Sequence, residues 1–306
     1  MSANFLSNKP DIVRGLKQPM PNQVLNEAVG ANEEFDSLAA DEFLPEWETM
    51  SFRLTGKAET CSLTAQSRIW AYSDPTSPAA DRFRLAQIRL KNLQSSRKLK
   101  NLLITSPLPG DGKTTVALNL ATVLAENGRV PVLVLEADVH RPTILTRLGL
   151  KPWAGLTECF NRREDPMLAI RRINPLGFYL LPAGEPLNDG SSILQSAFVS
   201  QLVKAFASSS VGWVLIDAPP TVPVADVLAL NAHADGTLLV ARAGATPREA
   251  IDESIRQLGP DHIVGMILNG IEGLERIYSR YYGYGKPAAP SKPNVQQGLG
   301  LNEKAK

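Results

Sequence analysis

The fold of this chain follows from one run of residues, Leu102-Leu103-Ile104-Thr105-Ser106-Pro107-Leu108-Pro109-Gly110-Asp111-Gly112-Lys113-Thr114-Thr115. Leu102 to Ile104 are continuously apolar, which predicts a short strand covered on both faces. Gly110 and Gly112 carry no Cβ, so the backbone can turn sharply and direct its N–H groups at a phosphate. Residues 116–126 carry apolar residues among small ones. They predict a helix packed on a sheet, with its N-terminus facing that phosphate.

This run is typical of a phosphate-binding loop of the Walker A type. Lys113 is expected to reach the β- and γ-phosphates of a nucleotide, and Thr114 to place its hydroxyl on Mg²⁺. The pattern asks for a glycine where this chain has Pro107, so a glycine-rich turn with a chance Gly-Lys-Thr is the alternative. The flanking strand and helix favour the phosphate loop. The predicted nucleotide-binding residues of the loop are Pro109, Gly110, Asp111, Gly112, Lys113, Thr114 and Thr115.

Composition excludes several classes of protein. The 306 residues have a net charge of +1, so no global basic field argues for a nucleic-acid partner. The two cysteines, Cys61 and Cys159, have no metal-type spacing and fit a reducing cytosol. No apolar run is long enough to span a membrane, and the N-terminus is polar and interrupted by prolines. We therefore expect a cytoplasmic protein that meets a membrane only through a partner.

The chain divides by composition into a folded region with two polar ends. Residues 1–48 and 287–306 are poor in hydrophobic residues and are predicted to be disordered. The region between them, 49–286, begins with a part in which Ile69 to Tyr72, together with Phe52 and Leu54, suggest one or two short strands. Residues 79–93 then predict a helix, whose basic face is either a solvated surface or an interface. The nucleotide-binding core is predicted at 101–273 and a tyrosine-rich segment at 274–286.

Strands and helices alternate through the core. Strands are predicted at 101–106, 131–137, 178–181, 213–217, 236–241 and 262–268. Helices are predicted at 113–127, 142–149, 192–207, 223–232 and 246–258. This alternation predicts an α/β fold with a doubly wound, mainly parallel sheet, helices on both faces, and ligands at the carboxyl ends of the strands.

Two of these strands end in acidic residues. Glu136 and Asp138 follow the strand at 131–137, and Asp217 follows the strand at 213–217. A carboxylate at the ligand crevice is costly to bury unless it meets a metal or a cation. Asp217 is of the Walker B type, which holds Mg²⁺ directly or through water. The alternative is that these acids cap the next helix or pair with Arg141.

These motifs together resemble the bacterial tyrosine kinases (BY-kinases) of capsule and exopolysaccharide production, over about residues 74–286. The matching segments are Pro109-Gly110-Asp111-Gly112-Lys113-Thr114-Thr115, Leu118-Asn119-Leu120-Ala121, Glu136-Ala137-Asp138-Val139-His140-Arg141-Pro142 (Walker A′), Leu181-Pro182-Ala183-Gly184, Ile216-Asp217-Ala218-Pro219-Pro220 (Walker B), 235–242 and Ile267-Leu268-Asn269-Gly270. The resemblance ends in a tyrosine cluster made of Tyr278, Tyr281, Tyr282 and Tyr284. It implies a P-loop NTPase of the deviant-Walker, MinD/ParA-like superfamily.

The resemblance implies ATP-dependent autophosphorylation of those four tyrosines between copies of the chain, with Mg²⁺. By the same resemblance, Glu136 would accept the tyrosine proton and Asp138, with Asp217 and Thr114, would serve the metal. Arg242 and Asn269 are candidates for adenine contact, or equally structural residues at strand ends. The family usually has Asp in place of Glu136 and Arg in place of His140.

The resemblance also implies partners. A membrane polysaccharide co-polymerase would activate the chain at the inner face of the plasma membrane, and a tyrosine phosphatase would counteract it. Copies would join through an acid followed by two arginines, but Gln87 breaks that pattern after Asp81 and Arg84. The rival functions are a ParA/MinD-like ATPase switch, disfavoured by Leu108 where such proteins carry a second lysine, and a nucleotide-binding scaffold that has lost catalysis, suggested by Glu136.

Overall fold

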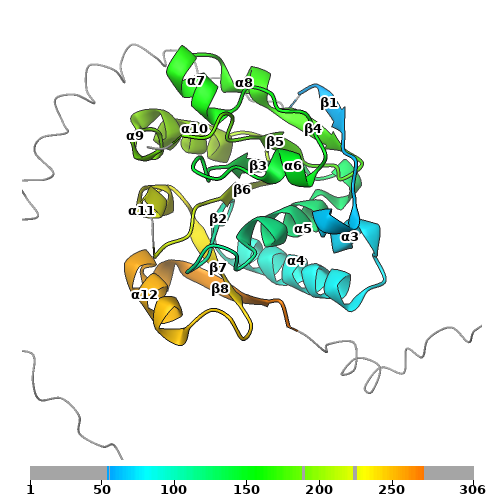
Figure 1. Cartoon of the computed structure of the whole chain (residues 1–306), viewed down its shortest axis with the longest axis vertical. Helices are drawn as coiled ribbons and strands as arrows, with labels where there is room; N and C mark the ends of the chain where they lie inside the picture. The colour runs from blue at the N-terminus through cyan, green and yellow to red at the C-terminus, as the bar shows by residue number, and fades with distance from the viewer. Residues whose placement is uncertain (1–53, 55, 188–189, 223–225, 272–306) are drawn as a thin grey trace, which may run out of the picture. The chain divides into compact units, whose positions relative to one another are not determined.

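The computed structural model describes residue 54 and residues 56–187, 190–222 and 226–271 (Figure 1). The predicted disordered ends at 1–48 and 287–306 lie outside the described residues, as does the tyrosine-rich segment at 274–286. Those predictions therefore stand as predictions, and the fold below concerns the described core.

A mainly parallel sheet forms the centre of this core (Figure 1). Its strands lie in the order β1-β4-β5-β3-β6-β2-β7-β8, and only the β4–β5 pair among them is antiparallel. The strands are β1 (Ala58–Thr60), β2 (Asn101–Thr105), β3 (Val132–Glu136), β4 (Arg171–Asn174), β5 (Tyr179–Leu181), β6 (Trp213–Asp217), β7 (Gly236–Arg242) and β8 (Ile263–Asn269). This arrangement confirms the predicted α/β fold class.

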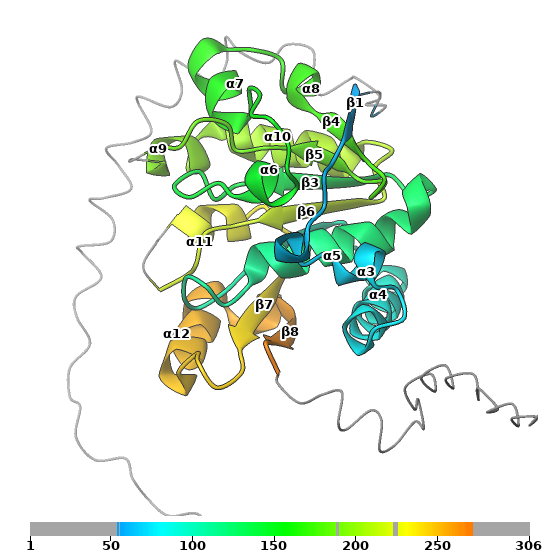
Figure 2. The same ribbon diagram turned by 45° about the vertical axis from the view of Figure 1, so that its right-hand side comes forward.

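Helices cover both faces of the sheet (Figure 2). The α-helices are α3 (Trp70–Ser73), α4 (Pro78–Ser96), α5 (Lys113–Ala125), α6 (Ile144–Arg147), α7 (Leu156–Arg162), α8 (Pro166–Ala169), α9 (Ser191–Leu194), α10 (Ala197–Ser208), α11 (Asp226–Asn231) and α12 (Arg248–Leu258). Short 3-10 turns lie at η1 (Ala65–Ser67), η2 (Glu126–Gly128) and η3 (Pro260–His262). Helix α5 packs on the central strands with α3 and α4 outside it, whereas α9 to α12 pack on the other face.

The central strands β2, β3 and β6 are buried along their whole length. Continuous apolar sequence produces this burial, because a parallel strand between two helical layers has no solvent face. Leu102, Val134 and Leu215 point to the α5 side and join a core cluster with Leu118 and Leu120 of that helix. The core thus fixes α5, and with it the phosphate loop, on the middle of the sheet.

The six predicted strands and the long helices at 79–93 and 113–127 are confirmed with small shifts at their ends. The prediction of strands at 69–72 is wrong, because Trp70–Ser73 forms helix α3. The aromatic residues there favour a strand locally, but the hydrogen bonds that Asn119 accepts from Ala71 and donates to Arg68 override that propensity. The helix predicted at 192–207 is two helices, since Ser196 begins α10 as its N-cap.

Four short elements were not predicted, namely β1, β4, α7 and α8. The strands β1 and β4 lie at one end of the sheet and carry polar residues that show no apolar run. Within the part of the chain that the structure describes, no helix has the length and apolar character needed to cross a bilayer. Cys61 and Cys159 are both buried free thiols.

Candidate active site

The carboxyl ends of β2, β3 and β6 meet at one edge of the sheet. Register pairs Ile104 with Asp217 and Asp217 with Glu136 on neighbouring strands. The phosphate loop leaves β2 at this edge, so the parallel order of the strands brings the three predicted motifs together. The three predicted motifs thus lie at the same edge of the sheet.

Two glycines give the phosphate loop its shape. Gly110 has φ +88° and Gly112 has φ +101°, a left-handed backbone that favours glycine. A Cβ on Gly112 would lie 2.0 Å from Nδ2 of Asn269. That Nδ2 donates a hydrogen bond to the backbone oxygen of Asp111 at 2.9 Å. Any side chain at position 112 would therefore displace the bond that ties the loop to the end of β8.

Asp111 braces the loop from within. Its carboxylate accepts a hydrogen bond from the backbone N–H of Leu108 at 3.0 Å and from the hydroxyl of Thr246 at 2.6 Å. Only 3% of Asp111 is exposed, and it does not line the pocket in front of the loop. Asp111 was predicted to bind nucleotide. Its contacts indicate that it supports the loop, with Thr246 as a partner that sequence reasoning missed.

Lys113 lies between the two predicted metal carboxylates. Its Nζ is 2.6 Å from Oδ2 of Asp138 and 4.0 Å from Oδ1 of Asp217. Burial alone lowers the pKa of Lys113, but the charges of Asp217 and Asp138 outweigh it, so the pKa of this ammonium is raised. Lys113 therefore keeps its positive charge where nucleotide phosphates are expected.

Asp217 is the most deeply buried acid of the site, with 1% of its surface exposed. Burial raises the pKa of Asp217, while Lys113 and a hydrogen bond from Thr114 oppose that shift. Its Oδ1 has no hydrogen-bond partner, which is costly for a buried oxygen. A cation with oxygen preference would satisfy this atom.

The donor set fits Mg²⁺ bound with a nucleotide. The hydroxyl of Thr114 and the carboxylates of Asp138 and Asp217 are hard oxygen donors, which Mg²⁺ prefers. No cluster of three or more His, Cys, Asp or Glu side chains that could hold a metal alone occurs among the described residues. Mg²⁺ commonly binds through one or two carboxylates together with substrate phosphates, so this donor set is of the expected kind.

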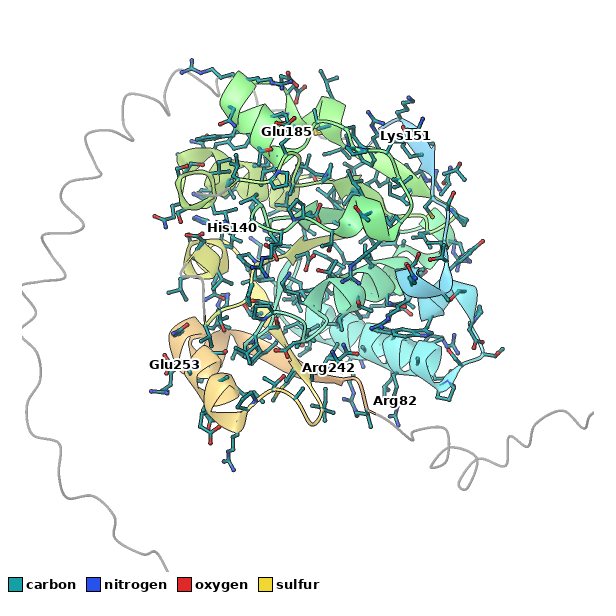
Figure 3. The ribbon with its side chains drawn as sticks, viewed as in Figure 1. Arg82, His140, Lys151, Glu185, Arg242 and Glu253 are labelled. Atoms are coloured by element: carbon teal, nitrogen blue, oxygen red, sulfur yellow. The ribbon has the colours of Figure 1, made fainter. Side chains whose placement is uncertain are left out.

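A pocket of about 680 Å³ opens in front of the loop. The predicted residues Pro109, Gly110, Gly112 to Thr115, Asp138, Arg242 and Asn269 line it. Its lining also includes Arg68, Trp70, Arg141 and Arg147, so cationic groups outnumber acids and the pocket suits a polyanion. Arg242 and His140, both labelled in Figure 3, are part of this lining.

Arg68, Trp70 and Arg147 were not predicted as site residues. Nη1 of Arg147 donates to Oγ1 of Thr115 at 3.1 Å, which joins α6 to the start of α5. Arg68 and Trp70 come from the segment before α4, in which residues 69–72 were predicted to form strands. One feature of the sequence could have indicated this segment. Asn119 is a polar residue inside an apolar helix, so its side chain needs buried hydrogen-bond partners.

Glu136 has contacts that differ from those expected of a general base. Its Oε1 accepts the backbone N–H groups of Thr143 at 2.7 Å and Ile144 at 2.8 Å, and its Oε2 accepts that of Ala183 at 3.2 Å. Burial, opposed by these hydrogen bonds, raises the pKa of Glu136 to about 7. The geometry therefore favours the capping alternative, in which Glu136 holds the start of α6.

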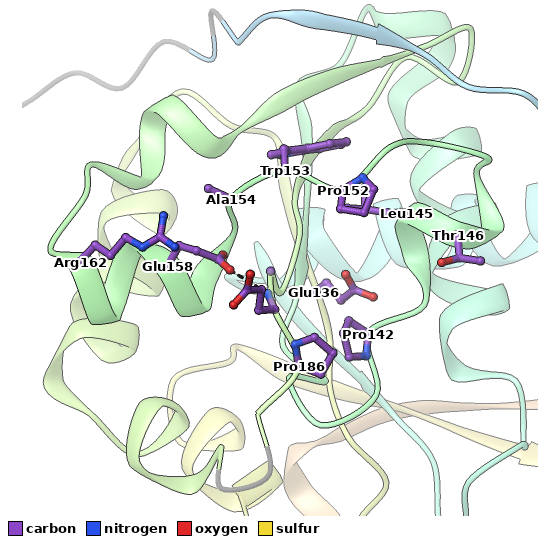
Figure 4. Close-up of a pocket in the computed structure, with 12 residues that line it drawn as sticks. Glu136, Pro142, Leu145, Thr146, Pro152, Trp153, Ala154, Glu158, Arg162 and Pro186 are labelled. Carbon is purple, nitrogen blue, oxygen red and sulfur yellow. Dashed lines mark hydrogen bonds between the residues drawn. The ribbon is translucent and has the colours of Figure 1, made fainter.

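Glu136 also lines a second cavity instead of the nucleotide pocket. This cavity, of about 500 Å³, lies among α6, α7 and the segment after β5 (Figure 4). Trp153 and Glu158 are part of its wall, whereas Asp138 is not. The loop between Glu136 and Ile144 separates the two hollows, so the two acids of the predicted Walker A′ motif face different spaces.

Two further residues that differ from the family pattern, His140 and Gln87, make side-chain hydrogen bonds in the structure. Nε2 of His140 lies 3.1 Å from Oδ2 of Asp226, so this side chain joins the Walker A′ loop to α11. Asp81 pairs with Arg84 on the same helix, and Nε2 of Gln87 donates to the backbone oxygen of Val123 at 2.7 Å. Gln87 thus contacts α5, where the family pattern expects an outward arginine. The four predicted phosphoacceptor tyrosines lie outside the described residues.

Comparisons with known proteins agree with this geometry. The chain is 30% identical over 220 residues to "Tyrosine-protein kinase YwqD" of Bacillus subtilis, covering 71% of this chain and 92% of YwqD. It is 26% identical to "Succinoglycan biosynthesis transport protein ExoP" of Rhizobium meliloti but spans only 29% of that protein. The kinase domain of Escherichia coli tyrosine kinase ETK superposes with a TM-score of 0.64 at 25% identity, over 74% of this chain and 88% of the domain. No protein-family model matches the chain.

The burial of Glu136 predicts a pH dependence of stability. Because its pKa rises from 4.5 to about 7 on folding, the folded state binds more protons than the unfolded state between these values. The free energy of unfolding should therefore fall by about 3 kcal/mol as pH rises through this window, and then level off. Urea unfolding of the wild type and Glu136→Gln between about pH 5 and about pH 8 measures this term.

The Glu136→Gln variant should show a flatter profile, since its amide does not ionise. It should also be less stable in acid, because its NH₂ group would face the N–H of Ala183. The exposed Glu249→Gln serves as control and should keep the wild-type slope. Equal slopes for the wild type and Glu136→Gln would contradict the assigned pKa.

Proposed function

The chain belongs to the bacterial tyrosine-protein kinases, and from this premise we propose that it transfers the γ-phosphoryl group of ATP to tyrosine hydroxyls of other copies of itself. The observation that carries the proposal is the buried ammonium of Lys113 beside Asp138 and Asp217, at the mouth of a glycine loop. Such a site meets what phosphoryl transfer requires, which is positioning and neutralisation of charge.

Each residue has a distinct task in this proposal. Lys113 exchanges its contact with Asp138 for phosphate oxygens, and backbone N–H groups at the start of α5 bind the rest of the phosphate chain. Mg²⁺ bound with ATP supplies a cation that neutralises charge during transfer. Thr114, Asp138 and Asp217 present the oxygen atoms that would hold it. The family relationship favours this reading over the ParA/MinD-like ATPase switch.

We infer that Glu136 is a positioning residue in this chain. Its hydrogen bonds to Thr143 and Ile144 fix the end of the loop that carries Asp138. Asp138 lines the nucleotide pocket and Glu136 does not, which supports Asp138 as the carboxylate nearer to an incoming hydroxyl. The role of proton acceptor, expected at Glu136 from the family, is therefore not kept for Glu136 in the proposal.

The proposed acceptors are Tyr278, Tyr281, Tyr282 and Tyr284. Ile271, the last described residue before them, lines the nucleotide pocket, so the segment that carries them begins beside it. Each phosphate adds about −1.5 to −2 charge near pH 7. Several phosphates would repel the segment from a site that contains Asp138 and Asp217, so phosphorylation should loosen the association of copies.

The cellular role in the proposal is regulation of exopolysaccharide or capsule assembly. The relative ExoP is named a succinoglycan biosynthesis transport protein, and this supports the role. A membrane polysaccharide co-polymerase would recruit the chain to the inner face of the plasma membrane and activate it, and a tyrosine phosphatase would reverse its phosphorylation. Copies of the chain would be the remaining partners.

A phosphotyrosine blot of purified chain in Mg-ATP tests the activity. Lys113→Met should nearly abolish the phosphotyrosine signal and ATP binding, because it removes the ammonium while keeping side-chain volume.

Asp138→Asn and Asp217→Asn should each lower transfer by about 10²-fold or more, because charge and positioning are lost together. Glu136→Gln should spare ATP binding and reduce transfer less than Asp138→Asn. The exposed Lys151→Met is the control and should match the wild type.

Two results would overturn parts of this reading. Wild-type signal in Lys113→Met would contradict the phosphate-loop assignment, and wild-type signal in both aspartate variants would contradict the metal site. A wild-type chain that binds Mg-ATP but forms no phosphotyrosine would identify it as the scaffold that has lost catalysis.

Replacing the four acceptor tyrosines by Phe tests the proposed destination of the phosphate. This variant should bind ATP, lose most phosphotyrosine and keep its self-association in Mg-ATP. Intact-protein mass spectrometry and sedimentation, with the exposed Tyr72→Phe as control, measure both effects. Phosphate found mainly outside residues 278–284, or an unchanged oligomer after full phosphorylation, would contradict the proposed switch.

A further inference from the structure

Arg68 has an unfavourable backbone conformation at the edge of the nucleotide pocket. Its φ of 54° and ψ of 40° are left-handed, a region that residues with a Cβ avoid for steric reasons. Such a conformation persists only where surrounding contacts impose it, and it is often associated with a functional site. The contacts that hold Arg68 in this left-handed conformation therefore bear on the role of Arg68 in the pocket.

Asn119 of helix α5 supplies those contacts. It is fully buried, and its Nδ2 donates to the backbone oxygen of Arg68 at 2.8 Å, while its Oδ1 accepts the N–H of Ala71 at 3.0 Å. Nδ2 also donates to the oxygen of Thr115, one helical turn earlier, at 2.9 Å. One side chain thus ties the turn at Arg68 to the helix that begins at the phosphate loop. Figures 1 and 2 show α3 beside α5, in agreement with this contact.

The backbone of the turn at Arg68 is bonded by Asn119, which lies further along α5 than Lys113 and Thr114 at the phosphate loop. Arg68 and Trp70 line the same pocket as Arg242 and Asn269, which come from the ends of other strands. The side chain of Arg68 is exposed and that of Trp70 is half-buried, so both can meet a ligand.

We propose that Arg68 contacts the nucleoside part of the bound nucleotide, with Trp70 beside it in the same wall. This inference rests on the proposed nucleotide binding and assigns a residue to it. A guanidinium is planar and weakly hydrated, so it packs well on the flat face of a purine and donates to ribose oxygens. The turn at Arg68 places this residue in the wall of the pocket.

Titration calorimetry with three probes tests this assignment, namely Mg-ATP, Mg-ADP and inorganic tripolyphosphate. Arg68→Gly should weaken Mg-ATP and Mg-ADP by the same factor, on the order of tenfold, because both carry the nucleoside. Tripolyphosphate affinity should change by less than about threefold, because that probe lacks the nucleoside. The melting temperature should be unchanged or raised, since glycine relieves the left-handed strain. A residue that only stabilised the fold would not lower the affinity for Mg-ATP and Mg-ADP while leaving tripolyphosphate affinity and the melting temperature intact.

Arg163 provides a matched control. It has the same backbone conformation, φ 54° and ψ 39°, at the end of α7, and it does not line the nucleotide pocket. Arg163→Gly should leave all three affinities unchanged. Arg68→Lys should lose part of the affinity for Mg-ADP, because an ammonium does not stack as a guanidinium does.

The binding results that would contradict this proposal can be told apart from those that would contradict the proposed function. Wild-type Mg-ADP affinity in Arg68→Gly, while Lys113→Met abolishes binding, would overturn the role of Arg68 alone. An equal loss for tripolyphosphate would also overturn it, because the arginine would then act through charge on the phosphates. A wild-type chain that binds none of the three probes would instead contradict the proposed function.

Discussion

The placement of one ammonium group between two carboxylates governs this site. Asp138 and Asp217 come from neighbouring strands, and each would be costly to bury as an isolated charge. Lys113 compensates both, at 2.6 Å and 4.0 Å. A buried pair of this kind is poor evidence for stability, because desolvation offsets much of the attraction. It is better understood as a preformed site in which a metal and phosphates can replace the internal partners.

The rest of the core serves to hold these charges at fixed positions. The parallel sheet brings the strand ends together, and the buried face of α5 fixes the phosphate loop above them. Asp111 braces the loop from one side through Leu108 and Thr246. Glu136 braces the Walker A′ loop from the other side through backbone N–H groups. Preorganisation of this kind is what catalysis by positioning requires.

The sequence predicted the sheet and the loop well, because both depend on local patterns. Continuous apolar runs and the Gly110–Thr115 signal identify buried strands and a phosphate site wherever they occur. It predicted the contacts of Glu136 poorly, since an acid at a strand end suits both capping and catalysis and only its neighbours decide between them. Arg68 was missed because its position depends on Asn119, which lies 51 residues away. Helix α3 was missed for the same reason.

A crystal structure with Mg²⁺ and a non-hydrolysable ATP analogue tests the central claim most directly. The distance from Nζ of Lys113 to Oδ2 of Asp138, now 2.6 Å, should lengthen as Lys113 moves to the β- and γ-phosphates. Mg²⁺ should lie about 2.0–2.1 Å from at least one oxygen of Thr114, Asp138 or Asp217. A structure in which the analogue binds while Lys113 stays paired with Asp138, or in which the metal lies away from all three residues, would contradict the account.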